Sequence, residues 1–146
     1  WRPSCHVFFN GEHLVGDFEN GAVSALGLDT YMDNGVPIRR LRTTQTMEKE
    51  QRRIRYGWLQ VDMETGVGLI TGQGSDPQLM LRYSDDGGHT WSNTKFASAG
   101  AIGNYRARAR FLRLGAARNR VWEITMTDPV KFAVFGGIAN AEVGFS

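Results

Sequence analysis

The sequence predicts an all-β protein built as an antiparallel meander, and three observations support this prediction. Helical periodicity is almost absent from the 146 residues. Turn signals recur at short intervals, at Asn10-Gly11, Asn20-Gly21, Asn34-Gly35 and Gly87-Gly88. Short runs suited to strands separate these turns. About ten such strands at regular spacing are typical of β-propeller blades, or of a β-sandwich if this stretch of chain closes alone.

The expected strands fall into two groups. The first four are separated by the three Asn-Gly pairs, so residues 1–50 resemble one propeller blade of four antiparallel strands. Residues 51–146 form a second meander with a hairpin at Gly87-Gly88. Residues 46–56, "TMEKEQRRIRY", are charged throughout and lack an apolar stripe, so we expect a solvated connection there and no helix. In chain order, the expected strands are residues 6–9, 13–18, 22–28, 37–44, 54–63, 78–84, 91–97, 105–114, 120–127 and 130–135.

The amino-acid composition argues against several classes of function. Hydrophobic residues make up 41% of the chain, which is typical of a globular protein. The net charge of +2 gives no general indication of a nucleic-acid or membrane-surface protein. Cys5 is the only cysteine, so no disulfide within the chain and no structural zinc site are expected. We therefore expect no metal and no cofactor, and no apolar run approaches the length of a membrane span.

Residues 84–91, "SDDGGHTW", fit the pattern S-x-D-x-G-x-T-W, which is called the Asp box. The pattern predicts a hairpin. The Asp side chain accepts hydrogen bonds from N–H groups of the turn, and the last Gly supplies a conformation closed to residues with a Cβ. The Thr starts the return strand and the Trp packs its ring onto the core. The residues concerned are Ser84, Asp86, Gly88, Thr90 and Trp91.

Two chemical alternatives for this region are weaker. A calcium site could use Asp76, Asp85 and Asp86, but a hard cation needs six or more oxygens and this loop supplies too few. Asp boxes also occur in sialidases and other propeller glycosidases, away from the catalytic site. Glycosidase chemistry needs a placed pair of carboxylates. The candidates show no spacing that makes them a site, so we expect no catalysis; they are Asp62, Glu64, Tyr105 and Arg106.

Arginines are concentrated in one stretch. Between Asn104 and Arg120 there are six arginines and no acid, and alternation on the predicted strand places Arg106, Arg108 and Arg110 on one face. Such a row could contact phosphate or carboxylates of another subunit. It could also be a solvated strand face.

A second basic patch lies on the predicted strand 37–44, at Arg39, Arg40 and Arg42. The same interpretations apply to it: a subunit or DNA contact, or a solvated face.

Several stretches together resemble a known family. They are residues 7–44, "VFFNGEHLVGDFENGAVSALGLDTYMDNGVPIRRLRTT"; residues 59–68, "LQVDMETGVG"; residues 81–93, "LRYSDDGGHTWSN"; and residues 99–137, of which "RLGAARNRVWEITMTDPV" is the most specific piece. In this order they resemble the C-terminal part of the packaged-DNA stabilization proteins of short-tailed phages, also called tail accessory factors, tail hub or nozzle proteins.

The resemblance implies a structural protein of the virion, assembled in the host cytoplasm, with no enzyme activity. Family members form a homo-oligomeric ring, typically of six subunits, below the portal and its adaptor. The ring continues the channel for double-stranded DNA, retains the packaged genome and carries the tail needle or fibres. The competing hypotheses are a glycan-binding or sialidase-like domain, suggested by the Asp box, and a DNA-binding module, suggested by the arginines.

On this interpretation the large aromatic side chains anchor the core, and Asn20-Gly21 and Asn34-Gly35 make blade turns. The three arginines at 106, 108 and 110 are the candidates for a subunit contact or a channel surface. The expected core anchors are Trp58, Trp91, Phe111 and Trp122.

Overall fold

The structure is a computed structural model that describes residues 2–144, and these residues form strands and turns with no helix. The all-β prediction is therefore confirmed. The described chain contains no helix long and apolar enough to cross a membrane. Contacts divide it into two compact units, with the division after Tyr31, whereas the sequence suggested a boundary at residue 50.

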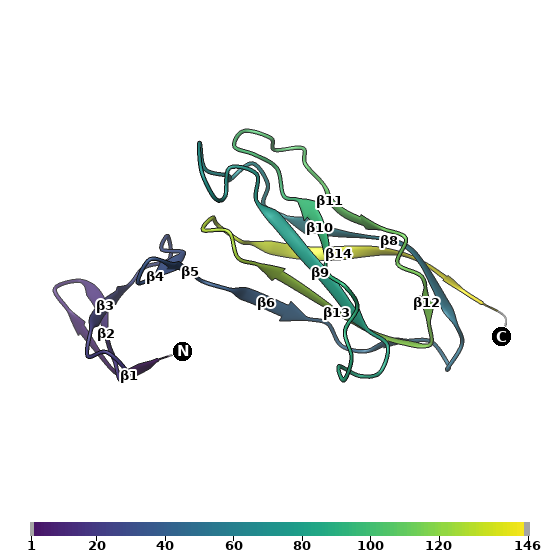
Figure 1. Ribbon diagram of the computed structural model, residues 1–146, viewed down its shortest axis with the longest axis horizontal. Helices are drawn as coiled ribbons and strands as arrows, with labels where there is room; N and C mark the ends of the chain where they lie inside the picture. The colour runs from purple at the N-terminus through teal and green to yellow at the C-terminus, as the bar shows by residue number, and fades with distance from the viewer. Residues whose placement is uncertain (1, 145–146) are drawn as a thin grey trace. The chain divides into compact units, whose positions relative to one another are not determined.

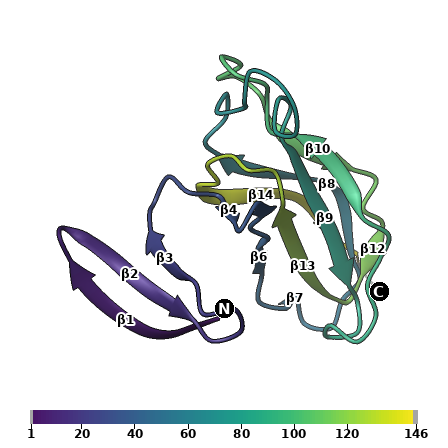
Figure 2. The ribbon, with the colours of Figure 1, turned by 60° about the vertical axis from the view of Figure 1, so that its left-hand side comes forward.

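The first unit is a three-stranded antiparallel sheet, in the order β1 (Pro3–Phe9), β2 (Glu12–Asp17) and β3 (Val23–Leu26) (Figure 2). Asn10 and Gly11 join β1 to β2 with φ angles of 49° and 83°, the pair of positive values that a type I′ hairpin turn requires. The Asn-Gly turn signal is confirmed at this position.

The blade-like meander expected in residues 1–50 has only three strands in one sheet. Asn34-Gly35 forms a separate hairpin between β4 (Met32–Asp33) and β5 (Val36–Pro37). The strand expected at 37–44 becomes β6 (Arg40–Thr43), which pairs with a strand more than seventy residues later, where Thr43 lies opposite Glu123. Long-range pairing along an otherwise open strand edge has overridden the local meander pattern.

The second unit contains two antiparallel sheets that face each other across a core (Figure 1). One sheet has the order β10-β9-β13-β6, with β7 also paired to β13. The other has β8 at its centre, with β11 and β12 along one edge and β14 along the other. Of the two architectures that the sequence left open, this unit adopts the β-sandwich. Its further strands are β7 (Met47–Glu48), β8 (Ile54–Met63), β9 (Gln78–Ser84), β10 (Lys95–Ser98), β11 (Ala109–Leu112), β12 (Ala116–Ala117), β13 (Asn119–Met126) and β14 (Val134–Val143).

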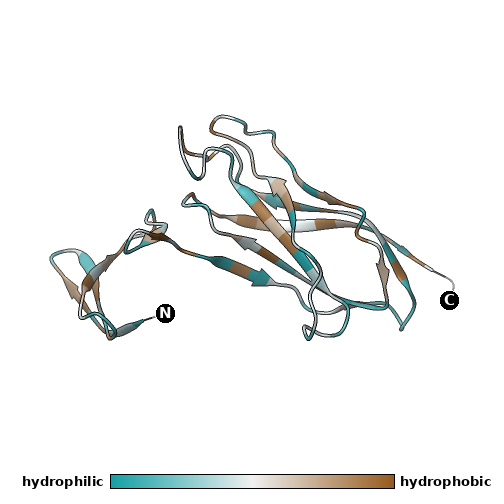
Figure 3. Ribbon diagram, viewed as in Figure 1, coloured by the Kyte–Doolittle hydropathy of each residue, from teal (hydrophilic) through white to brown (hydrophobic). Residues whose placement is uncertain are grey.

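Apolar side chains from both sheets fill the space between them, mainly from β8, β9 and β13, and Figure 3 shows the apolar stretch along β9. Trp122 and Phe111 are 1% and 2% exposed, so both expected anchors are confirmed. Alternation in β13 directs Trp122, Ile124 and Met126 toward the core. The most deeply buried partners in the core are Tyr56, Leu79, Leu81, Ala109 and Leu114.

A bulge in β8 explains why Trp58 is not a core residue. Asn140 pairs with Trp58 and Ala141 with Tyr56, so Gly57 is an extra residue on β8. The inward positions therefore shift from Tyr56 to Leu59, and Trp58 faces outward and is half-buried. A Cβ at Gly57 would lie 2.4 Å from the Asn140 side-chain oxygen, so glycine fits this position closely.

Several strand boundaries differ from the predictions. β8 and β9 match their predicted ranges, and residues 46–53 are an exposed connection, as expected, that also contains β7. The strand expected at 105–114 begins only at Ala109, because residues 105–106 form a turn. The strand expected at 130–135 begins at Val134 and continues to Val143, along the whole length of β8.

Candidate functional site

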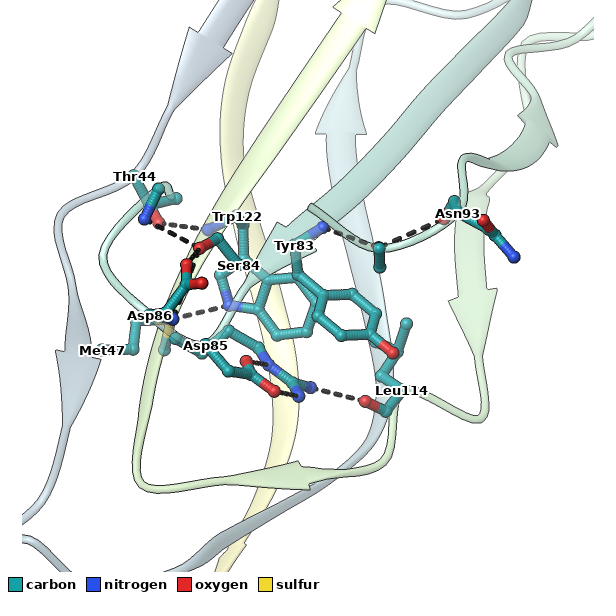
Figure 4. Close-up of polar contacts among 12 residues, drawn as sticks. Thr44, Met47, Tyr83, Ser84, Asp85, Asp86, Asn93, Leu114 and Trp122 are labelled. Carbon is teal, nitrogen blue, oxygen red and sulfur yellow. Dashed lines mark hydrogen bonds and ion pairs between the residues drawn. The ribbon is translucent and has the colours of Figure 1, made fainter. Parts of the chain in front are cut away.

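The Asp box forms a tightly bonded loop after β9 (Figure 4). Ser84 Oγ donates to Asp86 Oδ1 at 2.7 Å and accepts a hydrogen bond from Gly88 N at 2.8 Å. Thr90 donates from its backbone N at 2.9 Å and from its hydroxyl at 2.6 Å to the Asp86 carboxylate. Gly88 has a φ of 102°, which residues with a Cβ rarely adopt. The polar groups of the box thus serve the turn, as the sequence predicted.

These hydrogen bonds stabilise the ionised form of Asp86. The Ser84 hydroxyl, then the hydroxyl and backbone N–H of Thr90, hold the pKa of Asp86 well below its ordinary value. Because this carboxylate stays ionised in acid, it keeps accepting the hydrogen bonds of the loop over a wide pH range.

Two details of the Asp-box prediction are wrong. Thr90 lies within the loop, and the return strand β10 begins only at Lys95. Trp91 is half-buried and does not reach the core; the Arg82 guanidinium lies 4.7 Å from the centre of its ring. Outside the core, the Trp ring therefore supports an arginine on the surface of β9.

The residue next to Asp86 is an aspartate with a side chain that is 43% exposed, and it pairs with a deeply buried arginine. The Asp85 carboxylate accepts two hydrogen bonds from Arg120, from Nε and from Nη2, each at 2.6 Å. The Arg120 side chain is 2% exposed, and it also donates to the backbone oxygen of Leu114. In the sequence, Arg120 is one of the six arginines between Asn104 and Arg120. Arg120 lies two residues before Trp122 at the start of β13, so alternation along the strand directs both side chains to the same, inward face.

Three aromatic rings surround the buried guanidinium. Its carbon lies 4.0 Å from the ring centre of Tyr83, 5.0 Å from that of Tyr56 and 5.1 Å from that of Trp122. Burial raises the pKa of Tyr56, and the nearby positive charge of Arg120 partly opposes this rise. We call these five residues, Arg120, Asp85, Tyr56, Tyr83 and Trp122, the arginine cage. The cage joins β8, β9 and β13 to the Asp-box loop.

Trp122 also connects the cage to the segment after β6. Its backbone N donates to Thr44 Oγ1 at 3.0 Å, and its indole N–H donates to the Met47 sulfur at 3.1 Å (Figure 4). Thr44 N in turn donates to the Trp122 carbonyl.

The predicted row of three arginines is divided in the structure. Arg106 lies in the exposed turn before β11, and Arg108 follows it outside the strand. Only Arg110 lies on β11, where its guanidinium stacks 4.6 Å from the ring centre of Trp58 and donates to Gln60 at 2.8 Å. Arg110 therefore covers an outward-facing aromatic ring.

The second basic patch is divided between the two faces of its sheet. Arg40 turns inward, donates to the backbone oxygens of Asp128 and Val130, and is partly buried. Arg39 faces outward with its side chain 58% exposed, and it lies 3.9 Å from the carboxylate of Glu123. Arg42 is exposed on the edge strand β6. The three arginines do not form one surface.

In the structure, neither the residues proposed for a calcium site nor those proposed for a glycosidase site come together as a site. The Asp85 and Asp86 carboxylates are bound by Arg120 and by Thr90, and within residues 2–144 no three His, Cys, Asp or Glu side chains are grouped as a metal site. Among the proposed glycosidase residues, Glu64 pairs with Lys131 at 2.8 Å and Asp62 accepts from Gln60 at 2.9 Å. Tyr105 and Arg106 lie in the exposed turn before β11.

The model of one protein family, described as bacteriophage P22 Gp10, beta-sandwich, matches residues 39–142. The matched range runs from just before β6 to the last residue but one of β14 and so includes both sheets. The chain belongs to the P22 Gp10 β-sandwich family. A search of the curated proteins finds no match.

Family membership makes the chain a structural protein of a short-tailed phage tail, which belongs to the virion and assembles with other tail proteins. The resemblance seen in the sequence is confirmed at this level. Within the Gp10 family domain, the cage and the Asp-box loop hold the two sheets and their connections in place.

Removal of the Asp85 carboxylate should destabilise the fold markedly. Asp85→Ala leaves Arg120 buried without its counter-ion, so we expect the free energy of unfolding to fall by about 2–4 kcal/mol in urea denaturation. Glu64→Ala, which breaks a more exposed ion pair, should cost less than about 1 kcal/mol. Addition of Arg120→Met to Asp85→Ala should recover part of the loss. Equal effects of the two single substitutions would contradict a buried ionic centre.

Asp86 should contribute to stability in a pH-dependent way. Its pKa is lower in the folded than in the unfolded chain, so its contribution is complete above the unfolded value of about 3.9 and is lost as the pH falls further. The difference in Tm between the wild-type protein and Asp86→Asn should therefore shrink between neutral pH and strong acid. Asp29→Asn, at an exposed position, is the control. A difference in Tm that stays constant with pH would show that the charge of Asp86 is unimportant.

Proposed function

We propose that the chain is part of a tail hub, or nozzle, that forms a ring below the portal and its adaptor. The ring continues the DNA channel, retains the packaged genome and anchors the tail needle or fibres. It is a homo-oligomer, hexameric by analogy with the family resemblance, and it assembles in the host cytoplasm. In this role the chain is not an enzyme and needs no cofactor. The match of the Gp10 family to the whole sandwich is the observation that supports this proposal.

A surface suited to a subunit contact lies on the outer face of the β8 sheet. Leu112 pairs with Trp58 on one side, and Ile138 pairs with Gln60 on the other. Leu112 and Ile138 are 57% and 52% exposed, and Arg110 lies over the Trp58 ring between these rows. Neighbouring apolar side chains with a stacked arginine are typical of the central part of a protein interface. We call this patch the β8 outer face.

The first unit also exposes apolar side chains. Register places Val7, Leu14 and Ala25 in one row across the sheet, with Val23 on the same face. Val7 and Val23 are 55% and 71% exposed. A small sheet that leaves such a face open is expected to be covered in an assembly.

Two of the arginines remain candidates for contact with DNA. Arg106 and Arg108 are exposed in and after the turn that precedes β11. Contacts with the phosphate backbone need no base recognition, and their strength falls steeply with salt. This agrees with a channel through which DNA of any sequence passes.

The Asp box does not by itself favour a glycan-acting protein. Both Asp86 oxygens and the Ser84 hydroxyl are engaged within the turn. The box therefore stabilises a loop in this chain and offers its polar atoms to no ligand.

The ring should be visible by electron microscopy. The phage protein that carries this chain, purified alone and mixed with the portal–adaptor complex, should give six-fold class averages or added density below the adaptor. Leu112→Glu places a charge on the β8 outer face and should abolish rings with little change in Tm. Phe96→Glu, on the outer face of the other sheet, should leave the rings intact. A monodisperse monomer that does not bind the adaptor would refute the proposal.

A further inference from the structure

A shallow pocket of about 210 Å³ opens on the outer face of the β9–β13 sheet. It is smaller than the pockets of about 300–1,000 Å³ that hold drug-sized ligands, so its size suits a single sugar ring or a comparable group. It lies on the sheet opposite to the β8 outer face. Its lining includes Arg39, Met80, Arg82, Thr94, Glu123 and Thr125.

The pocket has one positive charge more than it has negative charges. The Arg82 Nε–H donates to Glu123 Oε1, and the ring of Trp91 supports the same guanidinium from outside. Arg82 and Glu123 therefore neutralise each other. Arg39 lies 3.9 Å from the same Glu123 oxygen, too far for a hydrogen bond, and its side chain is 58% exposed. Arg39 can therefore turn to an anion in the pocket without loss of a hydrogen bond.

The pocket also offers three uncharged hydroxyl groups and a carboxylate oxygen. Within residues 2–144, the hydroxyls of Thr94, Thr125 and Thr127 make no hydrogen bond to protein, although Thr125 is only 8% exposed. Both contacts of Glu123 with arginine use Oε1, so Oε2 has no donor from the described chain. A ligand that satisfies this set carries hydrogen-bond donors as well as an anionic group, and hydroxyl groups suit it because they both donate and accept.

One side of the pocket is apolar. Met80 lines it, and Phe96 is the cross-strand neighbour of Met80 on the outer face and is 63% exposed. The C–H face of a sugar ring packs well against such a surface, since its hydroxyls point to the sides.

We propose that this pocket binds a hexuronic acid unit of an acidic polysaccharide. The sugar carboxylate pairs with Arg39, its hydroxyls donate to Glu123 Oε2 and exchange hydrogen bonds with the threonines, and its C–H face lies on Met80. An acidic side chain from another protein would satisfy Arg39 but would supply no donor to Glu123. The role adds recognition of a surface polysaccharide to the structural role, and it does not depend on ring formation.

The binding test uses the whole chain and small probes, followed by NMR shifts on titration. D-glucuronate should bind with a dissociation constant on the order of 1 mM, as expected for a small polar ligand in an open site. Glucose, which lacks the carboxylate, and propionate, which lacks the hydroxyls, should each bind at least about tenfold more weakly. The shifted signals should include Thr125 and Met80.

Matched variants locate the site. Arg39→Gln should weaken glucuronate binding about tenfold or more, because it removes the excess charge. Arg42→Gln, at an exposed position three residues along the same segment, should bind like the wild-type protein. Thr125→Val should weaken binding severalfold. All three variants should keep the Tm and ring formation of the parent, so a failure of the binding proposal is distinguishable from a failure of the ring proposal.

Three outcomes would overturn the proposal. The first is the absence of saturable shifts with glucuronate at concentrations well above the expected constant. The second is equal binding of propionate and glucuronate, which would reveal a simple anion contact. The third is a loss of self-association in Arg39→Gln without any sugar binding, which would assign the pocket to a carboxylate of a neighbouring subunit.

Discussion

The burial of Arg120 is the constraint on which the rest of the sandwich depends. A guanidinium that is almost inaccessible to water must be paired, and Asp85 is the carboxylate that pairs it. Asp85 can reach it only if the loop after β9 turns back sharply, and the Asp box produces this turn. The rings of Tyr56, Tyr83 and Trp122 replace the remaining hydration. A buried guanidinium that loses its carboxylate partner is costly, so the cage ties β8, β9, β13 and their connecting loop into one arrangement.

This internal anchoring leaves the two outer faces of the sandwich available for different tasks. On the β8 sheet, the bulge at Gly57 turns Trp58 outward, and Arg110 covers its ring beside the exposed Leu112. That face is apolar and suits a protein partner. On the β9–β13 sheet, the outward Arg82, Glu123 and Arg39 make a polar pocket. A sheet whose core is held by a central cage can change its outer residues without a change of fold, because successive side chains point to opposite faces.

Sequence patterns predicted most of the strands but not their partners. Alternation and turn residues predict β8, β9, most of β13 and the Asn10-Gly11 hairpin, since these are local properties of the chain. β6 pairs with β13, which lies more than seventy residues later in the sequence, and a local sequence pattern cannot predict such a pairing. The core positions predicted for Trp58, as a large aromatic residue, and for Trp91, as the Trp of the Asp box, are wrong, because a one-residue bulge and a loop place both rings outside the core. The polar residues of the Asp box bond within a turn, but its Thr does not start the return strand and its Trp does not reach the core. The arginine cage and the pocket were not predicted, because each combines residues from three or more distant segments.

The most direct test of the cage is the proton exchange of the Arg120 Nε–H group in the folded protein, followed by ¹⁵N NMR. A hydrogen bond to Asp85 and three surrounding rings should give a slowly exchanging signal, displaced by ring currents, that remains visible at neutral pH. The exposed Arg106 and Arg108 provide the reference for rapid exchange in the same sample. A signal from Arg120 that exchanges as fast as theirs would show that the guanidinium is in water, and the account of how this sandwich is held together would be wrong.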